Sequence, residues 1–199
     1  MAVTTASMHE QHVAAEKTKP RLRVTFRKAA QRDIEPMAKV FQHAFAATNE
    51  FTNPVKYLDD ARHSRNHRLV TAKDADGKIA GFVMTNFNSF ARGSLYVDQL
   101  AVDPDFQGHG IGRALMKKAE EIALKHGYNA VALHVRKDND KAIALYKGLG
   151  YKKVGSDWWY YNDGMTGLEM VKSLRPAAAN DNKGWGIGTF FKKVLGFAP

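Results

Sequence analysis

The chain has 199 residues, of which 44% are hydrophobic and 25% charged, and it carries a formal net charge of +10 and no cysteine. This composition is typical of a globular domain with a sizeable core, and the lack of cysteine excludes a disulfide framework. No apolar run approaches the ~18 residues of a membrane-spanning helix. The N-terminus lacks the apolar stretch of a secretory signal, so we expect a cytoplasmic protein.

The excess of positive charge has two interpretations. A nucleic-acid-binding protein would gather Lys and Arg into a patch or a recognisable motif. Here these residues are scattered along the sequence, and no DNA- or RNA-binding motif is present. The sequence therefore favours the second interpretation, a basic surface that helps to attract an anionic cofactor.

The chain divides into a central domain and two terminal segments. Residues 1–21 contain few large apolar side chains and are predicted to form a flexible tail. Residues 22–174 contain all the predicted elements of the domain. Residues 175–199 form a linker and an apolar-basic segment, from Trp185 to Phe197, which suits a membrane surface or a groove on a protein partner. Docking on its own domain, docking elsewhere and disorder remain open for this segment.

Hydrophobic periodicity and turn residues predict the elements of the first half of the domain. Residues 23–28 alternate as a strand, and residues 33–46 place apolar side chains on one helical face. Asn53 and the proline after it predict the N-cap and first turn of a second helix, which ends near residue 64. Strands over 69–72 and 79–84 flank a turn over 74–77, which indicates a hairpin.

In the second half, strands and helices alternate. A strand over 95–102 precedes a glycine-rich turn, and the turn opens an amphipathic helix over 114–126. The remaining predicted elements are a strand over 131–135, a helix capped by Asp138 or Asn139 that runs to residue 147, and strands over 151–154 and 165–171. The order β-α-α-β-β-β-α-β-α-β-β predicts an α/β fold, with a mixed sheet and helices on its faces.

The most informative motif is the glycine-rich turn. Its sequence is Gln107-Gly108-His109-Gly110-Ile111-Gly112-Arg113. Small residues let the backbone approach a ligand, and the helix N-terminus adds positive partial charge, so the turn suits a phosphate group. Two common phosphate loops do not fit. No Gly-Lys-Ser/Thr triplet follows the glycines, and both registers of Gly-x-Gly-x-x-Gly fail because Arg113 or Leu115 occupies the last position.

The pattern that fits is Gln-x-x-Gly-x-Gly, and here the chain resembles the GCN5-related N-acetyltransferase (GNAT) family. The family's acetyl-CoA loop follows a strand and a turn like Val102-Asp103-Pro104. A second block resembles the family pattern Asn-x-x-Ala-x-x-x-Tyr-x-x-x-Gly-Tyr. Its members are Asn139, Ala142, Tyr146, Gly150 and Tyr151. The resemblance covers about residues 22–174 and is closest to the ribosomal-protein alanine N-acetyltransferases.

The resemblance implies a GNAT-like acyl-CoA N-acyltransferase fold, with acetyl-CoA as co-substrate and no metal. Backbone N–H groups of the turn would cradle the CoA pyrophosphate, and the edge of the preceding strand would pair with the pantetheine arm. An N–H near Val102 would polarise the thioester carbonyl. The residues implied in cofactor binding are Leu100, Ala101, Val102, Gln107, Gly108, His109, Gly110, Ile111, Gly112, Arg113, Asn139, Ala142 and Tyr146.

Direct transfer to an amine needs an acid and a base, since no residue stands out as a covalent nucleophile. The resemblance places the acid at Tyr146, which would protonate or hydrogen-bond the leaving thiolate; the alternative is a core aromatic. His134 stands where the ribosomal-protein alanine acetyltransferases have an acidic base, and an imidazole can accept a proton near neutral pH. Asp98 is the other candidate base, expected to share a strand face with Leu100 and Val102.

Two further clusters have competing interpretations. His63 and His67 have the i, i+4 spacing of a metal pair, but the surrounding arginines favour a solvated basic turn. The aromatic run from Trp158 to Tyr161 would either wall in a substrate or pack across an exposed hairpin.

The predicted function is acetyl-CoA-dependent N-acetyl transfer to a primary amine in a ternary complex. The acceptor would be the amine of a small molecule, a protein or a peptide. The alternative is a non-catalytic acyl-CoA-binding sensor or interaction module. The motifs identify the donor and leave open both the acceptor and a homodimeric state, which is common in the family.

Overall fold

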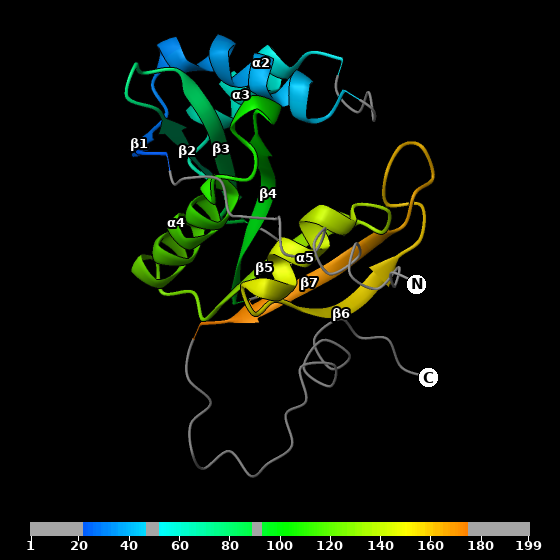
Figure 1. The fold of residues 1–199 in the computed structure, drawn as a ribbon. Helices are drawn as coiled ribbons and strands as arrows, with labels where there is room; N and C mark the ends of the chain where they lie inside the picture. The colour runs from blue at the N-terminus through cyan, green and yellow to red at the C-terminus, as the bar shows by residue number, and fades with distance from the viewer. Residues whose placement is uncertain (1–21, 47–51, 89–92, 175–199) are drawn as a thin grey trace, which may run out of the picture.

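The computed structural model describes residues 22–46, 52–88 and 93–174, so the predicted terminal tail and C-terminal segment lie outside the described residues. In the described part a seven-stranded sheet has the order β1-β2-β3-β4-β5-β7-β6 (Figure 1). All neighbouring strands are antiparallel except β4 and β5, which are parallel. The predicted mixed α/β architecture is confirmed.

The elements follow the predicted order, with boundaries that differ by a few residues. The strands are β1 (Thr25–Lys28), β2 (His67–Lys73), β3 (Ile79–Asn86), β4 (Ser94–Val102), β5 (Ala130–Arg136), β6 (Lys152–Asp157) and β7 (Gly167–Ser173). The helices are α2 (Ile34–Ala44), α3 (Pro54–His63), α4 (Ile111–Lys125) and α5 (Asp140–Gly148), with 3-10 turns η1 (Gln31–Asp33) and η2 (Pro104–Phe106).

Local sequence signals account for several element ends. The Asn53 side chain accepts a hydrogen bond from the backbone N–H of Lys56 at 2.9 Å, and Asn139 accepts one from Ala142 at 3.0 Å. Each bond satisfies a first-turn N–H that has no partner within its helix. Gly77 has a φ of +82°, which suits the tight turn between β2 and β3. The predicted N-cap at Asn53 and the first hairpin are therefore confirmed, and of the two predicted caps for α5 the structure has Asn139 and not Asp138.

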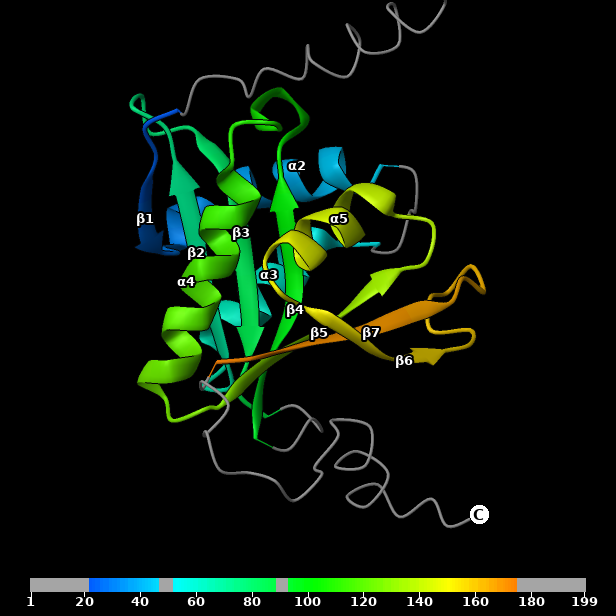
Figure 2. The same ribbon diagram turned by 60° about the horizontal axis from the view of Figure 1, so that its bottom comes forward.

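Two hydrophobic cores lie on opposite faces of the sheet. Helices α2 and α3 cover one face, while α4 and α5 cover the other (Figure 2). Successive side chains of a strand point to opposite faces, so Phe82 of β3 packs in the α2–α3 core and its neighbour Val83 in the α4–α5 core. Each of these side chains is completely buried. Helices thus pack on both faces of the sheet through buried apolar side chains.

Truncating a core side chain of α4 should destabilise the fold much more than truncating an exposed one. Leu115 is fully buried and Leu124 of the same helix is 55% exposed. We expect Leu115→Ala to lower the free energy of unfolding by about 2–5 kcal/mol, because it leaves a cavity. The matched variant Leu124→Ala should change it by less than about 0.5 kcal/mol. Urea unfolding measures both values, and equal effects would contradict the packing described.

Candidate active site

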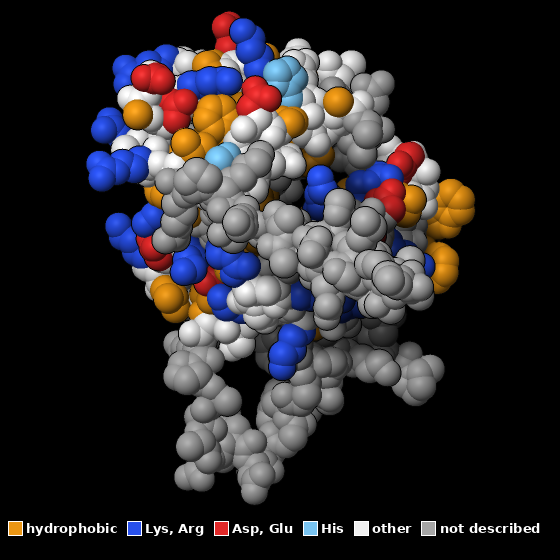
Figure 3. Space-filling model, in the orientation of Figure 1, with side chains coloured by type: hydrophobic (Ala, Val, Ile, Leu, Met, Phe, Trp, Pro, Cys, Tyr) orange, Lys and Arg blue, Asp and Glu red, His pale blue; other side chains and the backbone are white. Residues whose placement is uncertain are grey.

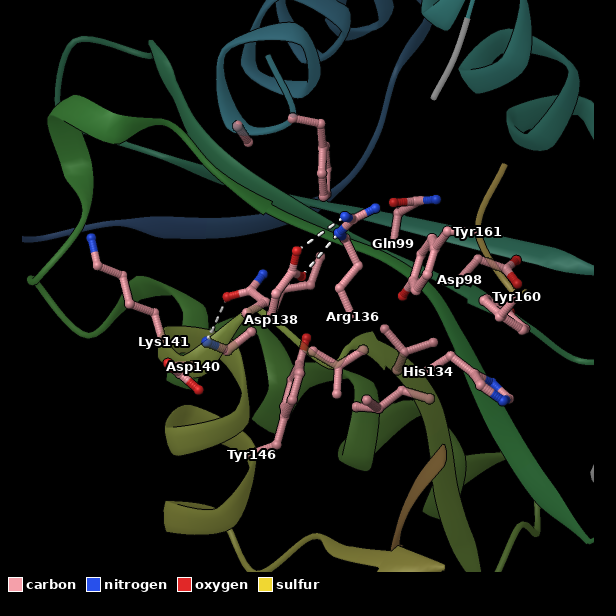
Figure 4. A pocket seen from close by; sticks show the side chains of 18 of the residues that line it. Asp98, Gln99, His134, Arg136, Asp138, Asp140, Lys141, Tyr146, Tyr160 and Tyr161 are labelled. Atoms are coloured by element: carbon pink, nitrogen blue, oxygen red, sulfur yellow. Dashed lines mark hydrogen bonds and ion pairs between the residues drawn. The ribbon is translucent and has the colours of Figure 1, made fainter. Parts of the chain in front are cut away.

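The candidate site lies where two neighbouring strands separate. β4 and β5 pair only over their first halves, from Ser94 opposite Ala130 to Val97 opposite Leu133. Beyond this point β4 continues along β3, while β5 diverges with β7 (Figures 1 and 2). A cavity of about 860 Å³ occupies the split, with walls from β4, β5, α5 and the loop between β6 and β7 (Figure 4).

A β-bulge in β4 coincides with the start of the split. Met84 of β3 lies opposite Gln99, and the next residue, Thr85, lies opposite Val97, which leaves Asp98 as the extra residue. A bulge shifts the alternation of side chains by one position. Val97 and Leu100 therefore both pack toward the α4–α5 core, although three positions separate them.

The bulge places Asp98 on another face of β4 than the one expected from the sequence. Leu100 and Val102 pack toward the α4–α5 core. Asp98 instead lies 3.2 Å from Nε2 of His67. On β2, His67 lies two residues before Leu69 and therefore on the same face of the sheet. Leu69 packs in the α2–α3 core. Asp98 therefore does not share a face with Leu100 and Val102, and the extra residue in β4 is the physical reason.

The Asp98 carboxyl occupies a largely buried position in the cavity wall. Its side chain is 18% exposed, and the His67 side chain is 24% exposed. Burial raises the pKa of the Asp98 carboxyl, and the charge of His67 opposes the shift. The Asp98 side chain therefore lies beside a residue of β2, across the intervening strand β3.

His134 lies at the centre of a polar cluster on the face opposite Tyr146. Its Nδ1 atom is 2.7 Å from the hydroxyl of Tyr96, and its Nε2 atom is 2.6 Å from Oδ2 of Asp157. The ring of Tyr160 stacks on the imidazole, with centroids 4.1 Å apart and an interplanar angle of 6°. Neither Tyr96 nor Asp157 is marked by a motif, because each is one polar residue in a strand and only the sheet pairing brings them to His134.

Tyr146 reaches the cavity from α5. It is 7% exposed and lines the cavity wall, and its ring packs 5.9 Å from that of Tyr151. Figure 4 shows the side chains of Tyr146 and His134 extending from different elements, with their rings directed away from each other. Burial raises the pKa of the Tyr146 phenol, so the group stays protonated at neutral pH. The residue is thus both part of the core and exposed to the cavity.

The glycine-rich turn begins at the end of β4 and forms the N-terminus of α4. Gly108 and Gly110 have φ values of +84° and +77°, in the left-handed region that favours glycine. Helix α4 begins at Ile111, three positions before the predicted start, so Gly112 and Arg113 belong to its first turn. The N-cap residue Gly110 has no side chain to cap the helix, and a helix N-terminus of this kind suits an anion.

Several residues of the two motifs also make packing contacts. A Cβ atom on Gly112 would lie 3.3 Å from the side chain of Leu145, so glycine permits the close approach of α4 and α5. The Arg113 guanidinium donates to the carbonyl of Gly148 at 3.1 Å, at the end of α5. The Gln107 amide donates to the Val102 carbonyl at 3.2 Å. These bonds hold the turn and α5 together beside the open edge of β4.

The aromatic run forms a loop between β6 and β7 that is anchored to the cavity wall. Arg136 of β5 pairs with Asp163 of the loop at 2.8 Å, and its guanidinium lies 5.1 Å from the centre of the Tyr161 ring. By contrast, Trp158 and Trp159 are 79% and 80% exposed. Hydrophobic side chains project in Figure 3 at the edge where Figure 1 places this loop. Part of the run therefore lines the site, and part faces solvent.

His63 and His67 belong to different elements. Helix α3 ends at His63, whose ring bonds the carbonyl of Asp59 at 2.9 Å, while His67 begins β2 and lies beside Asp98. The two residues therefore do not share a helical face. In residues 22–46, 52–88 and 93–174, no group of three or more His, Asp or Glu side chains is arranged to hold a metal ion.

The sequence of residues 34–151 matches the model of the acetyltransferase (GNAT) family. This match covers more than half of the chain, and the chain therefore belongs to the GNAT family. It is also 41% identical over 107 residues to an uncharacterized N-acetyltransferase of Methanocaldococcus jannaschii, a match that covers 51% of this chain and 43% of that protein. The chain thus spans less than half of this relative's length.

Solved structures confirm the fold. The ribosomal-protein-S18-alanine N-acetyltransferase from Escherichia coli superimposes with a TM-score of 0.66 at 26% identity, over 79% of this chain and 98% of that one. The yncA protein from Salmonella typhimurium, solved with its cofactor acetyl-CoA, gives a TM-score of 0.66 at 20% identity, over 80% and 99% of the two chains. The second likeness concerns the fold alone.

Two properties of the described residues concern binding to membranes and to nucleic acids. In the described part of the chain, every helix is too short or too polar to cross a bilayer. Figure 3 shows Lys and Arg side chains spread over several elements of the face in view, without forming a single patch. This distribution agrees with the scattered basic residues of the sequence.

The left-handed conformation at Gly110 leads to a stability prediction. A Cβ atom there would meet nothing within 4 Å, so only backbone strain opposes a side chain. We expect Gly110→Ala to lower the free energy of unfolding by about 1–2 kcal/mol, and Gly110→Asn to lower it less, because Asn tolerates this conformation. Urea unfolding separates the two variants. Equal stability of both variants and the parent protein would contradict the conformation described.

Proposed function

We propose that the chain transfers an acetyl group from acetyl-CoA to a primary amine by direct attack in a ternary complex. The observation that carries the proposal is the split between β4 and β5, which has the glycine-rich turn at one end and Tyr146 and His134 on opposite sides. Membership of the GNAT family supports the same activity.

The open edge of β4 supports binding of the donor. Beyond Val97, among the described residues, β4 has a strand partner on one side only. The backbone groups of its free edge can pair with the amides of the pantetheine arm, as an added strand would. The edge leads from Leu100 to Val102 and on to the turn at Gly108 and Gly110, whose geometry suits the pyrophosphate. This continuity orients the thioester toward the cavity.

Tyr146 supplies the hydrogen-bond donor for the leaving sulfur. A thiol has an ordinary pKa of about 8.5 and a phenol one of about 10. Burial raises the pKa of the Tyr146 phenol further, which keeps its proton available at neutral pH. Donation of a hydrogen bond stabilises the developing thiolate, and proton transfer completes the release of CoA. In this proposal the phenol acts at the sulfur and not at the amine.

His134 supplies the basic nitrogen on the opposite side of the split. A lysine-type amine has an ordinary pKa of about 10.4, so it must lose a proton before or during attack. Leu133 and Val135 pack in the α4–α5 core with Tyr146, so the intervening His134 points to the other face. A base and an acid on opposite faces can serve the amine and the sulfur of one tetrahedral intermediate. Asp98, held beside His67, is the less suitable base.

The experiment that tests the proposal is an amine panel with Tyr146 variants. Acetyl-CoA is mixed with small amines, polyamines and peptides that have free N-termini or lysines, and thiol release is measured. We expect turnover with at least one class of amine. Tyr146→Phe should lower kcat by about 10²-fold, the size of a general-acid contribution, with little change in acetyl-CoA affinity.

Tyr151→Phe is the matched control for this experiment. Tyr151 is 2% exposed, its ring packs beside that of Tyr146, and it does not line the cavity. We expect its kcat to stay close to that of the parent enzyme. Tight CoA binding without turnover of any amine would instead support the non-catalytic acyl-CoA-binding module.

A further inference from the structure

Both ring nitrogens of His134 already have partners in the structure. Nε2 lies 2.6 Å from Oδ2 of Asp157, and Nδ1 lies 2.7 Å from the hydroxyl of Tyr96. The ring face is covered by Tyr160, and only 13% of the His134 side chain is exposed. An acceptor amine therefore has no direct path to a ring nitrogen unless one of these bonds breaks.

The chemistry of the partners assigns the proton positions in the neutral imidazole. A carboxylate only accepts hydrogen bonds, so the short bond to Asp157 requires a proton on Nε2. Nδ1 then carries a lone pair and must accept the hydroxyl proton of Tyr96. The Tyr96 oxygen, 3.0 Å from the hydroxyl of Tyr160, keeps lone pairs that can accept a proton. Asp157 thereby directs the basic nitrogen of His134 toward Tyr96.

We propose that the Tyr96 hydroxyl, and not His134 itself, takes the proton from the acceptor amine and passes its own proton to Nδ1 of His134, with Asp157 as the positioning residue. This inference rests on the proposed acetyltransferase function. It assigns catalytic contact to Tyr96, a residue of β4 that lines the cavity directly before the split. Burial raises the pKa of the Tyr96 phenol, so the group enters the cycle protonated.

The relay balances in atoms and charge. The amine enters in its neutral form, after its ammonium proton has passed to solvent. Its nitrogen attacks the thioester carbon, the N–C bond forms, and the C–S bond breaks when the intermediate collapses. One proton leaves the nitrogen for Tyr96 while the Tyr96 proton moves to His134, and the resulting imidazolium faces the Asp157 carboxylate. A second proton moves from Tyr146 to the sulfur. The proton on His134 then returns through solvent to the Tyr146 phenolate, so the enzyme is restored.

The kinetic test is Tyr96→Phe in the full chain. This variant keeps the ring but removes the oxygen that relays the proton. We expect kcat to fall by about 10²-fold, in the range of general acid–base catalysis, with acetyl-CoA affinity and stability close to those of the parent enzyme. The matched control is Tyr128→Phe, because the Tyr128 hydroxyl is also hydrogen-bonded, to the Phe87 carbonyl at 2.7 Å, but lies outside the cavity. The control should keep full turnover.

A spectroscopic test examines the relay without turnover. In protein labelled with ¹⁵N-histidine, the His134 signals are assigned by their loss in His134→Gln. We expect the neutral ring to carry its proton on Nε2, and Asp157→Asn to weaken that preference, since an amide can donate as well as accept. A neutral ring protonated on Nδ1 would overturn the relay.

The outcomes separate the two proposals. If the parent enzyme acetylates an amine and Tyr96→Phe retains kcat within about threefold, the relay is wrong and the proposed function stands. A roughly threefold change in kcat is far below the range of general acid–base catalysis. If the parent enzyme acetylates no amine, the proposed function fails and the catalytic role of Tyr96 fails with it. A large loss in Tyr96→Phe, together with the Nε2 tautomer, supports both.

Discussion

The site depends on the point at which β4 stops pairing with β5. Backbone N–H and C=O groups are costly to leave without partners, so a sheet normally continues its pairing to the strand ends. Here the bulge at Asp98 and the divergence of β5 leave one edge of β4 open from Leu100 to Val102. In the proposed mechanism that edge pairs with the amide groups of an extended ligand, and the turn after it binds the phosphate groups. A single change in strand pairing thereby creates both the cavity and the unpaired strand edge that leads to it.

The alternation of side chains along β5 then places the two proposed catalytic groups on opposite faces of the strand. Because side chains alternate, neighbouring residues of β5 face different layers of the molecule. Leu133 and Val135 pack with Tyr146 under α5, whereas His134 faces Tyr96 and Asp157. The split is the place where groups from both faces can act on one substrate. The proposed mechanism uses this geometry by assigning the sulfur to one face and the amine to the other.

Burial and pairing set the electrostatics of the cavity wall. Burial raises the pKa of the Tyr96 and Tyr146 phenols, so both remain proton donors. Arg136 near them pairs with Asp138 and Asp163, and Nε2 of His134 lies beside the Asp157 carboxylate. In the proposed mechanism His134 is the group that finally holds the amine proton. An imidazole needs a partner to select its tautomer, which a carboxylate base does not, and the nearby Asp157 meets that need.

The sequence alone determined the order of elements, the N-cap at Asn53 and the glycine-rich turn, and it narrowed the cap of α5 to Asp138 or Asn139, because periodicity, capping and turn chemistry act over a few neighbouring residues. The spacing of the two motifs also led to the correct family. Only the tertiary structure decided the face of Asp98, since one bulge reverses the alternation of side chains. It also decided the partners of His134, because Tyr96 and Asp157 lie far from it along the chain and meet it only through strand pairing and the return of β6. Such contacts leave no local signal in the sequence, which is why the glycine-rich turn could be located from the sequence and the polar cluster around His134 could not.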